Sequence, residues 1–228
     1  MATKRPTLAR MLDTLEKMYG AVHIDPPRDV LGLILWENVA YLVDDERRRA
    51  AFAALKKRVG LAPARIRAAT TEVLYELASL GGMHPAQRVD RLREIADIAL
   101  ADFADDLEAV LALPPAKARR ALRKFPGIGE PGAEKILLFT RTEPVLAFES
   151  NGLRALLRLG FGAESKNYAR SYKSAQLAVE PMIERDCDAR IRAWHLLRAH
   201  GQALCKYKAP DCDPCPLADA CAFAQRVG

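Results

Sequence analysis

Aromatic residues are scarce in this chain of 228 residues, and long apolar segments are missing. Phe, Trp and Tyr make up 7% of the sequence, which argues against a large β-sandwich or barrel because strands favour aromatic and β-branched residues. The longest apolar stretch, residues 30–43, is interrupted by Glu37 and Asn38 and is too short to cross a bilayer. We therefore expect no membrane segment and no membrane partner.

A secretory signal is also lacking. The opening residues MATKRPTLARMLD contain no run of roughly 7–15 apolar residues, which a signal core needs. We therefore expect a cytoplasmic protein in a reducing compartment. In such a compartment, the five cysteines of the chain favour metal or redox chemistry over disulfides.

Charge of one sign is not strongly in excess. The chain has 35 Lys and Arg against 29 Asp and Glu, a formal net charge of +6, which suits an anionic partner without identifying one. Half of the residues are hydrophobic, which is enough for a packed core and excludes a largely disordered chain. At this length we expect one large domain or two small ones.

Apolar residues recur at steps of three and four along nearly the whole chain, which predicts an all-α protein. The segment 30–43 is apolar on most sides and is expected to be deeply buried. The expected helices cover residues 8–18, 30–43, 45–59, 62–80, 85–103, 105–113, 115–124, 131–139, 152–159, 165–182 and 188–200.

Four of the five cysteines fall in one C-terminal loop with the spacing C-x6-C-x2-C-x5-C, namely Cys205, Cys212, Cys215 and Cys221. Thiolates this close together indicate one compact metal centre. A zinc site usually combines two short ligand pairs across a longer spacer, and only one CxxC pair is present. A cuboidal iron–sulfur cluster accepts more widely spread ligands, so we favour it over zinc or a pair of disulfides. Cys187 stands apart and is expected to be a small buried hydrophobic residue.

A Gly-x-Gly turn, Gly127-Ile128-Gly129, joins two short expected helices. Glycines let the backbone approach a ligand, and the start of the following helix adds N–H groups and the positive end of a dipole. The preceding helix carries several basic residues, Arg123 and Lys124 among them, and no acidic ones. This combination predicts a grip on the DNA backbone that does not read sequence. The alternative is an ordinary turn between helices.

Together, the Pro-Gly-Ile-Gly hairpin at 126–129 and the cysteine spacing resemble the endonuclease III branch of the helix-hairpin-helix DNA glycosylase superfamily. The segment EPVLAFE at 143–149 is similar to the family's segment before its catalytic carboxylate, and His200-Gly201 ahead of the first loop cysteine is similar too. The resemblance covers most of the chain and is weaker before residue 110.

The resemblance implies a two-lobed, all-α fold. A six-helix barrel lobe would span residues 23–143, with the helix-hairpin-helix at about 115–139. Residues 144–228 would form a cluster lobe with the first helix, residues 1–22, and the four loop cysteines would hold a [4Fe-4S] cluster.

The same resemblance implies double-stranded DNA as the partner. The DNA would lie across the cleft, with the hairpin holding a phosphate and one nucleotide turned out, because catalytic groups cannot reach a stacked base. No obligate protein partner is implied, and the expected location is cytoplasmic and nucleoid-associated.

Two positions depart from the family's catalytic pattern. Members that also cut the strand have a lysine two residues after the second hairpin glycine, where this chain has Pro131, and proline cannot form a Schiff base. The position of the family's catalytic aspartate holds Glu149, followed by Ser150-Asn151 in place of the common Thr-His. We therefore expect no β-lyase activity.

Glu149 has two interpretations. As the catalytic carboxylate, it stabilises the cationic sugar while the N-glycosidic bond breaks and assists the attack of water. The dipole of the helix that begins near Gly152 favours its ionised form. Alternatively, Glu149 is a solvated residue ahead of a helix that is capped by Ser150 or Asn151.

Further candidates come from other segments. Lys135 lies one turn into the helix after the hairpin and is a possible replacement amine, with a solvent-facing lysine as the alternative. Asn38 falls where the family fills the gap left in the duplex, and Met83 and His84 occupy the loop where relatives insert a wedge. Glu37 is expected near the flipped nucleotide, at a surface helix end or paired to an arginine.

We therefore expect a monofunctional DNA glycosylase that hydrolyses the bond between a damaged or mispaired base and deoxyribose in base excision repair. The alternative is a non-catalytic protein that binds distorted or branched DNA and has lost the glycosylase chemistry, which both altered catalytic positions favour. A third interpretation is a cluster used for redox sensing.

Overall fold

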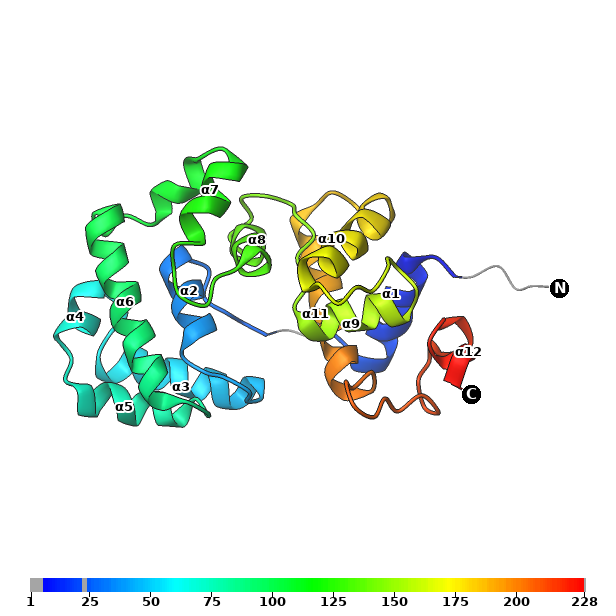
Figure 1. Cartoon of the computed structure of the whole chain (residues 1–228), viewed down its shortest axis with the longest axis horizontal. Helices are drawn as coiled ribbons and strands as arrows, with labels where there is room; N and C mark the ends of the chain where they lie inside the picture. Colours follow the sequence, from blue (N-terminus) through cyan, green and yellow to red (C-terminus); the bar gives the residue numbers. More distant parts are fainter. Residues whose placement is uncertain (1–5, 22–23, 228) are drawn as a thin grey trace. The chain divides into compact units, whose positions relative to one another are not determined.

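The computed structural model describes residues 6–21 and 24–227, and every regular element in these ranges is a helix (Figure 1). Within the same ranges, strand-like pairing is limited to an isolated bridge between Tyr41 and Gly82. The expectation of an all-α protein is confirmed. No helix in the described part is long and apolar enough to cross a membrane.

The chain divides into two compact units. We call Ile24–Thr142 the hairpin unit and Met1–His23 with Glu143–Gly228 the cysteine unit. The lobe boundary expected between residues 22 and 23 lies outside the described residues.

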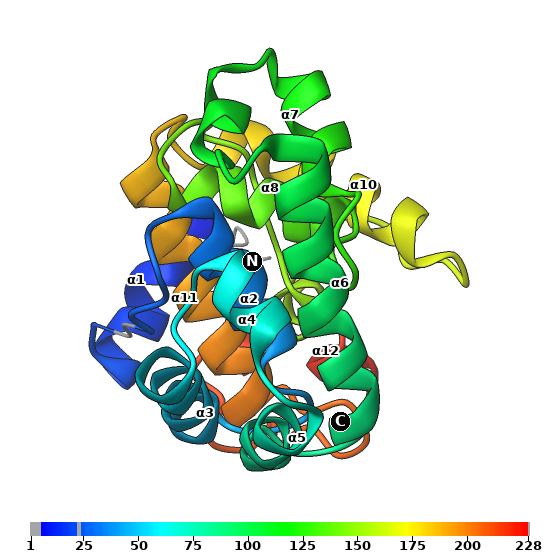
Figure 2. The same cartoon turned by 90° about the vertical axis from the view of Figure 1, so that its left-hand side faces the viewer.

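In the hairpin unit, the longest helix, α6, packs against α2, α4 and α5, and α3 lies beside α5 (Figure 2). Asp29 begins α2 by accepting the N–H of Gly32 at 2.6 Å, and the apolar side chains that follow are mostly buried. The elements are α2 (Val30–Asn38), α3 (Asp45–Arg58), α4 (Pro63–Ala68), α5 (Thr71–Leu80), α6 (Pro85–Phe103), η1 (Glu108–Ala112), α7 (Pro115–Leu122) and α8 (Glu130–Phe139).

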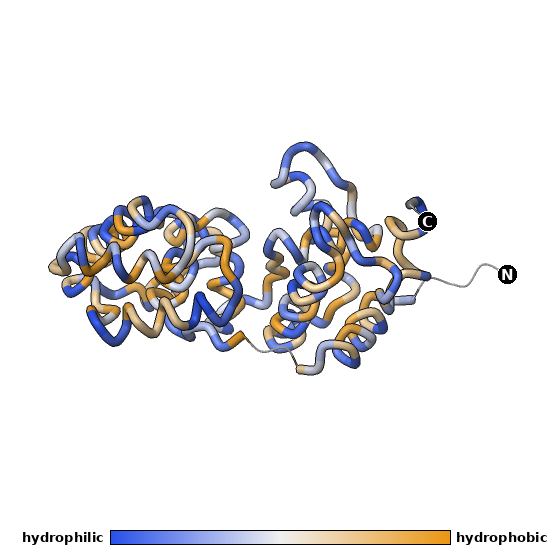
Figure 3. The backbone as a smooth tube through the Cα atoms, turned by 90° about the horizontal axis from the view of Figure 1, so that it is seen from below, coloured by the Kyte–Doolittle hydropathy of each residue, from blue (hydrophilic) through white to orange (hydrophobic). Residues whose placement is uncertain are grey.

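In the cysteine unit, α11 packs against α9 and α1. Arg192 on α11 pairs with Asp13 at 2.8 Å and Glu16 at 2.7 Å on α1. Hydrophobic and hydrophilic stretches alternate along the helices of both units (Figure 3), as expected for amphipathic helices. The elements are α1 (Leu8–Tyr19), α9 (Ser150–Arg158), α10 (Tyr168–Val179), η2 (Glu180–Met182), α11 (Cys187–Ala203), η3 (Ala218–Ala220) and α12 (Ala224–Val227).

The single helix expected at 62–80 is wrong, because the chain forms α4 and α5 instead. The Thr70 hydroxyl accepts the N–H of Val73 at 3.4 Å and caps α5. Threonine favours such a cap over a helix interior, and its polar side chain therefore starts a new helix here.

Two further expected helices are shorter in the structure. The helix expected at 105–113 is reduced to η1, because Ala104 and Asp105 both have positive φ and end α6. The helix expected at 30–43 ends at Asn38, and the chain beyond it pairs with the loop before α6.

Candidate functional site

The Gly-x-Gly turn between α7 and α8 is held against α2. Gly127 has a φ of +74°, in the left-handed region, and a Cβ there would lie 2.9 Å from Asn38 Oδ1. Asn38 Nδ2 donates to the carbonyls of Ile34 and Pro126, both at 3.0 Å. Both the backbone conformation and the close approach of α2 therefore require glycine at position 127.

Asn38 lies beneath this hairpin and is 2% exposed. The sequence-based expectation put it in the gap of a duplex, whereas in the structure its amide joins α2 to the turn. Its side chain therefore positions the hairpin and does not itself reach the surface.

Gly129 differs from Gly127 in its surroundings. Its φ is −85°, and a Cβ there would approach only Pro131 Cδ, at 3.8 Å. Ile128 between the two glycines is buried and anchors the turn. The backbone at Gly129 thus faces open space at the start of α8, where the first N–H groups of a helix have no acceptor within the helix. This is an arrangement that can accept an anion.

The cations around the turn have acidic partners that sequence reasoning missed. Glu130, the first residue of α8, pairs with Arg123 at 3.0 Å and Arg119 at 3.7 Å. Lys124 pairs with Asp102 at 2.8 Å. The basic surface of α7 is therefore partly neutralised in the free protein.

The loop that holds Met83 and His84 is exposed and anchored from below. Met83 is 53% exposed, and His84 adopts a φ of +55° and places its ring 6.1 Å from that of Tyr41. The buried guanidinium of Arg88 donates to three carbonyls at the end of α5 and in this loop. A fixed base with an exposed apolar tip fits the expected wedge, and Leu42, 71% exposed with a φ of +54°, is a neighbouring candidate that the sequence pattern did not indicate.

Lys135 is buried and ion-paired, so the solvent-facing interpretation is wrong. Its Nζ lies 2.6 Å from Glu37 Oε1, with side-chain exposures of 11% and 30%. Its amine also lies 5.5 Å from the centre of the Phe139 ring. Glu37, for which an arginine was one expected partner, is paired here with a lysine, and this pairing offsets the burial of the carboxylate.

Glu149 itself is the N-cap of α9, and the expected caps Ser150 and Asn151 are not. Glu149 Oε1 accepts the N–H of Gly152 at 2.7 Å, and Oε2 accepts Asn151 Nδ2 at 2.8 Å. The side chain is half-buried. These two donors fix the position of the carboxylate at the start of α9.

The carboxylate is connected to the cysteine loop by Arg154 on α9. The guanidinium of Arg154 donates to Asn151 Oδ1 at 2.8 Å, to the Cys205 carbonyl at 2.8 Å and to the Gly201 carbonyl at 2.6 Å. Asn151 therefore bridges Glu149 and Arg154, and the position of the carboxylate depends on the fold of the loop.

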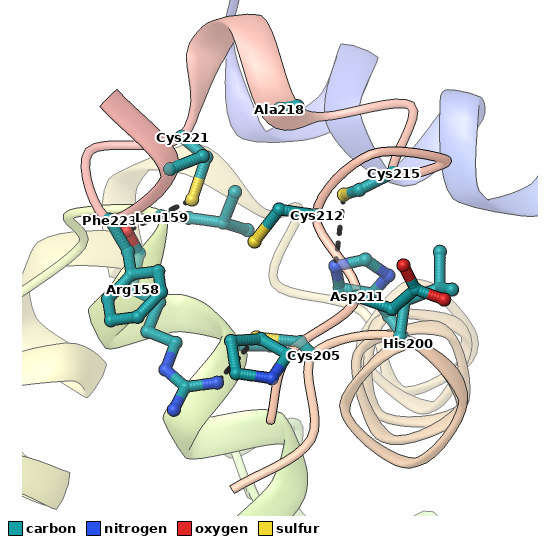
Figure 4. Close-up of a pocket in the computed structure, with 14 residues that line it drawn as sticks. Arg158, Leu159, His200, Cys205, Asp211, Cys212, Cys215, Ala218, Cys221 and Phe223 are labelled. Carbon is teal, nitrogen blue, oxygen red and sulfur yellow. Dashed lines mark hydrogen bonds between the residues drawn. The ribbon is translucent and has the colours of Figure 1, made fainter. Parts of the chain in front are cut away.

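The four loop cysteines line one pocket (Figure 4). Arg158 at the end of α9 donates to Cys205 Sγ at 3.5 Å and to the carbonyls of Lys206 and Tyr207 at 2.7 and 2.9 Å. Its guanidinium also lies 4.6 Å from the centre of the Phe223 ring. One arginine thus holds both ends of the loop around the sulfur atoms.

His200 borders the same pocket from α11. Its Nε2 lies 3.9 Å from Cys215 Sγ, and its Nδ1 lies 3.0 Å from the Tyr19 hydroxyl on α1. Burial lowers the pKa of His200 to about 4, so the ring is neutral near pH 7. Burial also raises the pKa of the Cys215 thiol.

The four loop thiols bear on the choice between a cluster, zinc and a pair of disulfides. All five cysteines are free thiols, so the alternative of a pair of disulfides is not formed. Among the described residues, no three His, Cys, Asp or Glu side chains converge as a single metal ion requires. Four sulfurs spread around one pocket suit a wider iron–sulfur group. Cys187, which begins α11, is partly exposed, so the expected full burial is corrected.

No family model matches the sequence. Among curated proteins, it is similar to endonuclease III of Sulfolobus acidocaldarius, with 26% identity over 199 residues that cover 86% of this chain and 83% of that protein.

Two solved structures share the fold. A trapped endonuclease III–DNA covalent intermediate superposes with a TM-score of 0.75 and 19% identity, covering 96% of each chain. A thermostable thymine-DNA glycosylase superposes with a TM-score of 0.72 and 17% identity, again covering 96% of each chain. The chain thus has the fold of these endonuclease III-like helix-hairpin-helix DNA glycosylases, and its sequence is similar to endonuclease III over most of its length.

Proposed function

We propose that the protein is a monofunctional DNA glycosylase that hydrolyses the N-glycosidic bond of a damaged or mispaired base in double-stranded DNA, as a step of base excision repair. The observation that carries this proposal is the fixed, half-buried carboxylate of Glu149. The endonuclease III and thymine-DNA glycosylase similarities support the same class of reaction.

Glu149 is the proposed catalytic residue. As the base leaves, positive charge develops on the sugar, and an ionised carboxylate held in place stabilises that charge without reorganising. The same carboxylate can accept a proton from the attacking water. Asn151 and the Gly152 N–H are positioning groups, because each holds one carboxylate oxygen.

The hairpin is the proposed phosphate grip. The backbone N–H groups at the start of α8 would contact a phosphate oxygen beside Gly129, where a side chain is absent. Arg123 and Lys124 would add charge, and Met83 and His84 would enter the duplex. These contacts hold DNA without reading its sequence.

The residues at positions 131 and 135 support hydrolysis over strand cleavage. Pro131 has no amine, and the amine of Lys135 is engaged in an ion pair with Glu37. We expect borohydride to trap no adduct between the protein and abasic DNA. An adduct that disappears in Lys135→Gln would identify Lys135 as a nucleophile and contradict the monofunctional proposal.

Cys205, Cys212, Cys215 and Cys221 are the proposed ligands of a [4Fe-4S] cluster. The cluster would supply a structural cross-link for the loop. We expect protein made in iron-replete, anaerobic conditions to be brown, with absorbance at about 400 nm. Cys212→Ser should lose this absorbance, and colourless wild-type protein would contradict the cluster.

The activity is tested with duplex oligonucleotides that carry uracil, alkylated, oxidised, deaminated or mismatched bases, followed by alkali to cleave abasic sites. We expect wild-type protein to give product on at least one duplex and Glu149→Gln to give none. Glu164→Gln, an exposed glutamate of the same unit, is the matched control and should keep the activity.

A non-catalytic DNA-binding protein is the second candidate. The ion pairs of Glu130 and the loss of the family's lysine at Pro131 favour it. Tight binding of wild-type protein without product on any duplex of the panel would support this candidate against the glycosylase.

A further inference from the structure

Two tyrosines stack at the start of α10 in the cysteine unit. Tyr168 and Tyr172 lie one helical turn apart, with ring centres 6.1 Å apart and ring planes inclined by 22°. Tyr172 is 4% exposed, whereas Tyr168 is 48% exposed. The buried ring therefore supports an outer ring that still presents much of its surface to solvent.

The stack is connected to Glu149. The ring of Tyr172 packs edge-on against Phe148, with centres 6.1 Å apart, and its hydroxyl accepts the Phe148 N–H at 3.4 Å. Phe148 immediately precedes Glu149. Partial burial raises the pKa of Tyr168, and the negative charge of Glu149 raises it further.

The segment around Tyr168 is both rigid and basic. The N–H of Ser165 donates to Ser171 Oγ at 2.8 Å, which ties the preceding loop to α10. Three exposed cations belong to the same segment, namely Lys166, Arg170 and Lys173. An aromatic surface with cations around it is the combination that binds single-stranded nucleic acid, since the ring stacks with a base and the cations attract phosphates.

We propose that Tyr168 is a stacking platform for the nucleobase that is turned out of the duplex while its sugar lies at Glu149. This inference rests on the proposed function and extends it, because it names the group that receives the base. Every nucleobase has a face that can stack, so the platform stabilises the extruded state without selecting one base. The aromatic ring of Tyr168 stacks with the base, and its hydroxyl is not needed.

The test uses a duplex that carries 2-aminopurine opposite an abasic-site analogue, because this base has no pairing partner and is fluorescent when unstacked. We expect wild-type protein to bind the duplex and quench the emission. Tyr168→Ala should bind about tenfold more weakly, as expected for loss of one stacked base, and leave the bound base bright. Tyr168→Phe should behave like wild type.

Leu177→Ala is the matched control, since Leu177 is 65% exposed on the same helix and should leave both signals unchanged. If Tyr168→Ala binds and quenches like wild type, the platform is overturned while the glycosylase proposal stands. If wild-type protein has no affinity for any duplex at low salt, the proposed function and the platform both fall. Thermal melting of Tyr168→Ala, expected at the wild-type temperature because the ring is half exposed, separates a lost contact from a lost fold.

Discussion

An acidic residue stands at the start of two short helices in this protein, and the two carboxylates are held in different ways. Glu149 accepts hydrogen bonds from its own helix and its neighbour Asn151. Glu130 instead reaches back to Arg119 and Arg123 on the preceding helix. The same chemical group near the start of a helix thus serves as a fixed cap in one unit and as a surface ion pair in the other.

The difference follows from position relative to the cap. Glu149 is the N-cap residue, whose side chain meets the N–H groups of the first turn. Glu130 is the first helical residue, after the N-cap Gly129, and its side chain turns toward the cations of α7. The start of α9 is therefore filled by its own carboxylate, while the start of α8 keeps an open backbone beside Gly129. We expect the first to do chemistry and the second to bind an anion.

Substitution of Glu149 should give the largest effect. Glu149→Gln retains an oxygen for the Gly152 N–H but loses the charge, so product formation should fall roughly 10²- to 10⁴-fold with little change in melting temperature. Glu149→Ala should also lose the cap, at about 1 kcal/mol of stability. The abasic-site assay and thermal unfolding measure the two effects separately. If Glu149→Gln stays active, the carboxylate is only a cap.

Substitution of the two hairpin glycines separates an effect on stability from an effect on DNA binding. Gly127→Ala meets a positive φ and the close Asn38 Oδ1, and should cost about 1–3 kcal/mol of stability in the hairpin unit. Gly129→Ala has room for its methyl group and should fold normally. It should nevertheless weaken DNA binding about tenfold, as expected for one lost hydrogen bond to a charged phosphate.

Denaturant unfolding and DNA binding by fluorescence anisotropy distinguish these variants. Unchanged DNA affinity in a well-folded Gly129→Ala protein would argue against a phosphate at this backbone and would leave α8 as an ordinary packed helix.

Patterns among residues close together in the sequence predicted the positions of several helices and the grouping of the four loop cysteines. Apolar periodicity located α6 and α8 closely, and the cysteine spacing predicted a common pocket. The pattern at 62–80 misled because Thr70 is compatible with the apolar repeat yet caps a new helix. A single polar side chain can set the start of a helix, and a periodic pattern of apolar residues does not detect that one side chain.

Such patterns did not predict the side-chain contacts of the site, because these contacts join residues far apart in the sequence. Lys135 meets Glu37 across 98 positions of the chain, and Asn38 meets the Pro126 carbonyl across 88. No local rule pairs residues at such separations, because the packing of α2 against α8 brings them together. The resemblance to a family located the hairpin and the carboxylate but gave no sign that Glu130 would occupy the arginines beside them.

The smallest predicted effect concerns Glu130. Its carboxylate competes with DNA phosphates for Arg119 and Arg123, and the pairs are partly exposed, so each contributes at most about 1 kcal/mol. Glu130→Gln should therefore bind DNA a few-fold more tightly at low salt. The plot of log affinity against log salt should steepen by about 0.9 for each additional phosphate that the freed arginines neutralise.

Glu76→Gln, which breaks an exposed pair with Arg58 in the same unit, should change neither the affinity nor its salt dependence. Weaker binding by Glu130→Gln would mean that the Glu130 carboxylate holds Arg119 and Arg123 in the orientation that binds DNA. Glu130 and Glu149 would then both act by holding neighbouring groups in place.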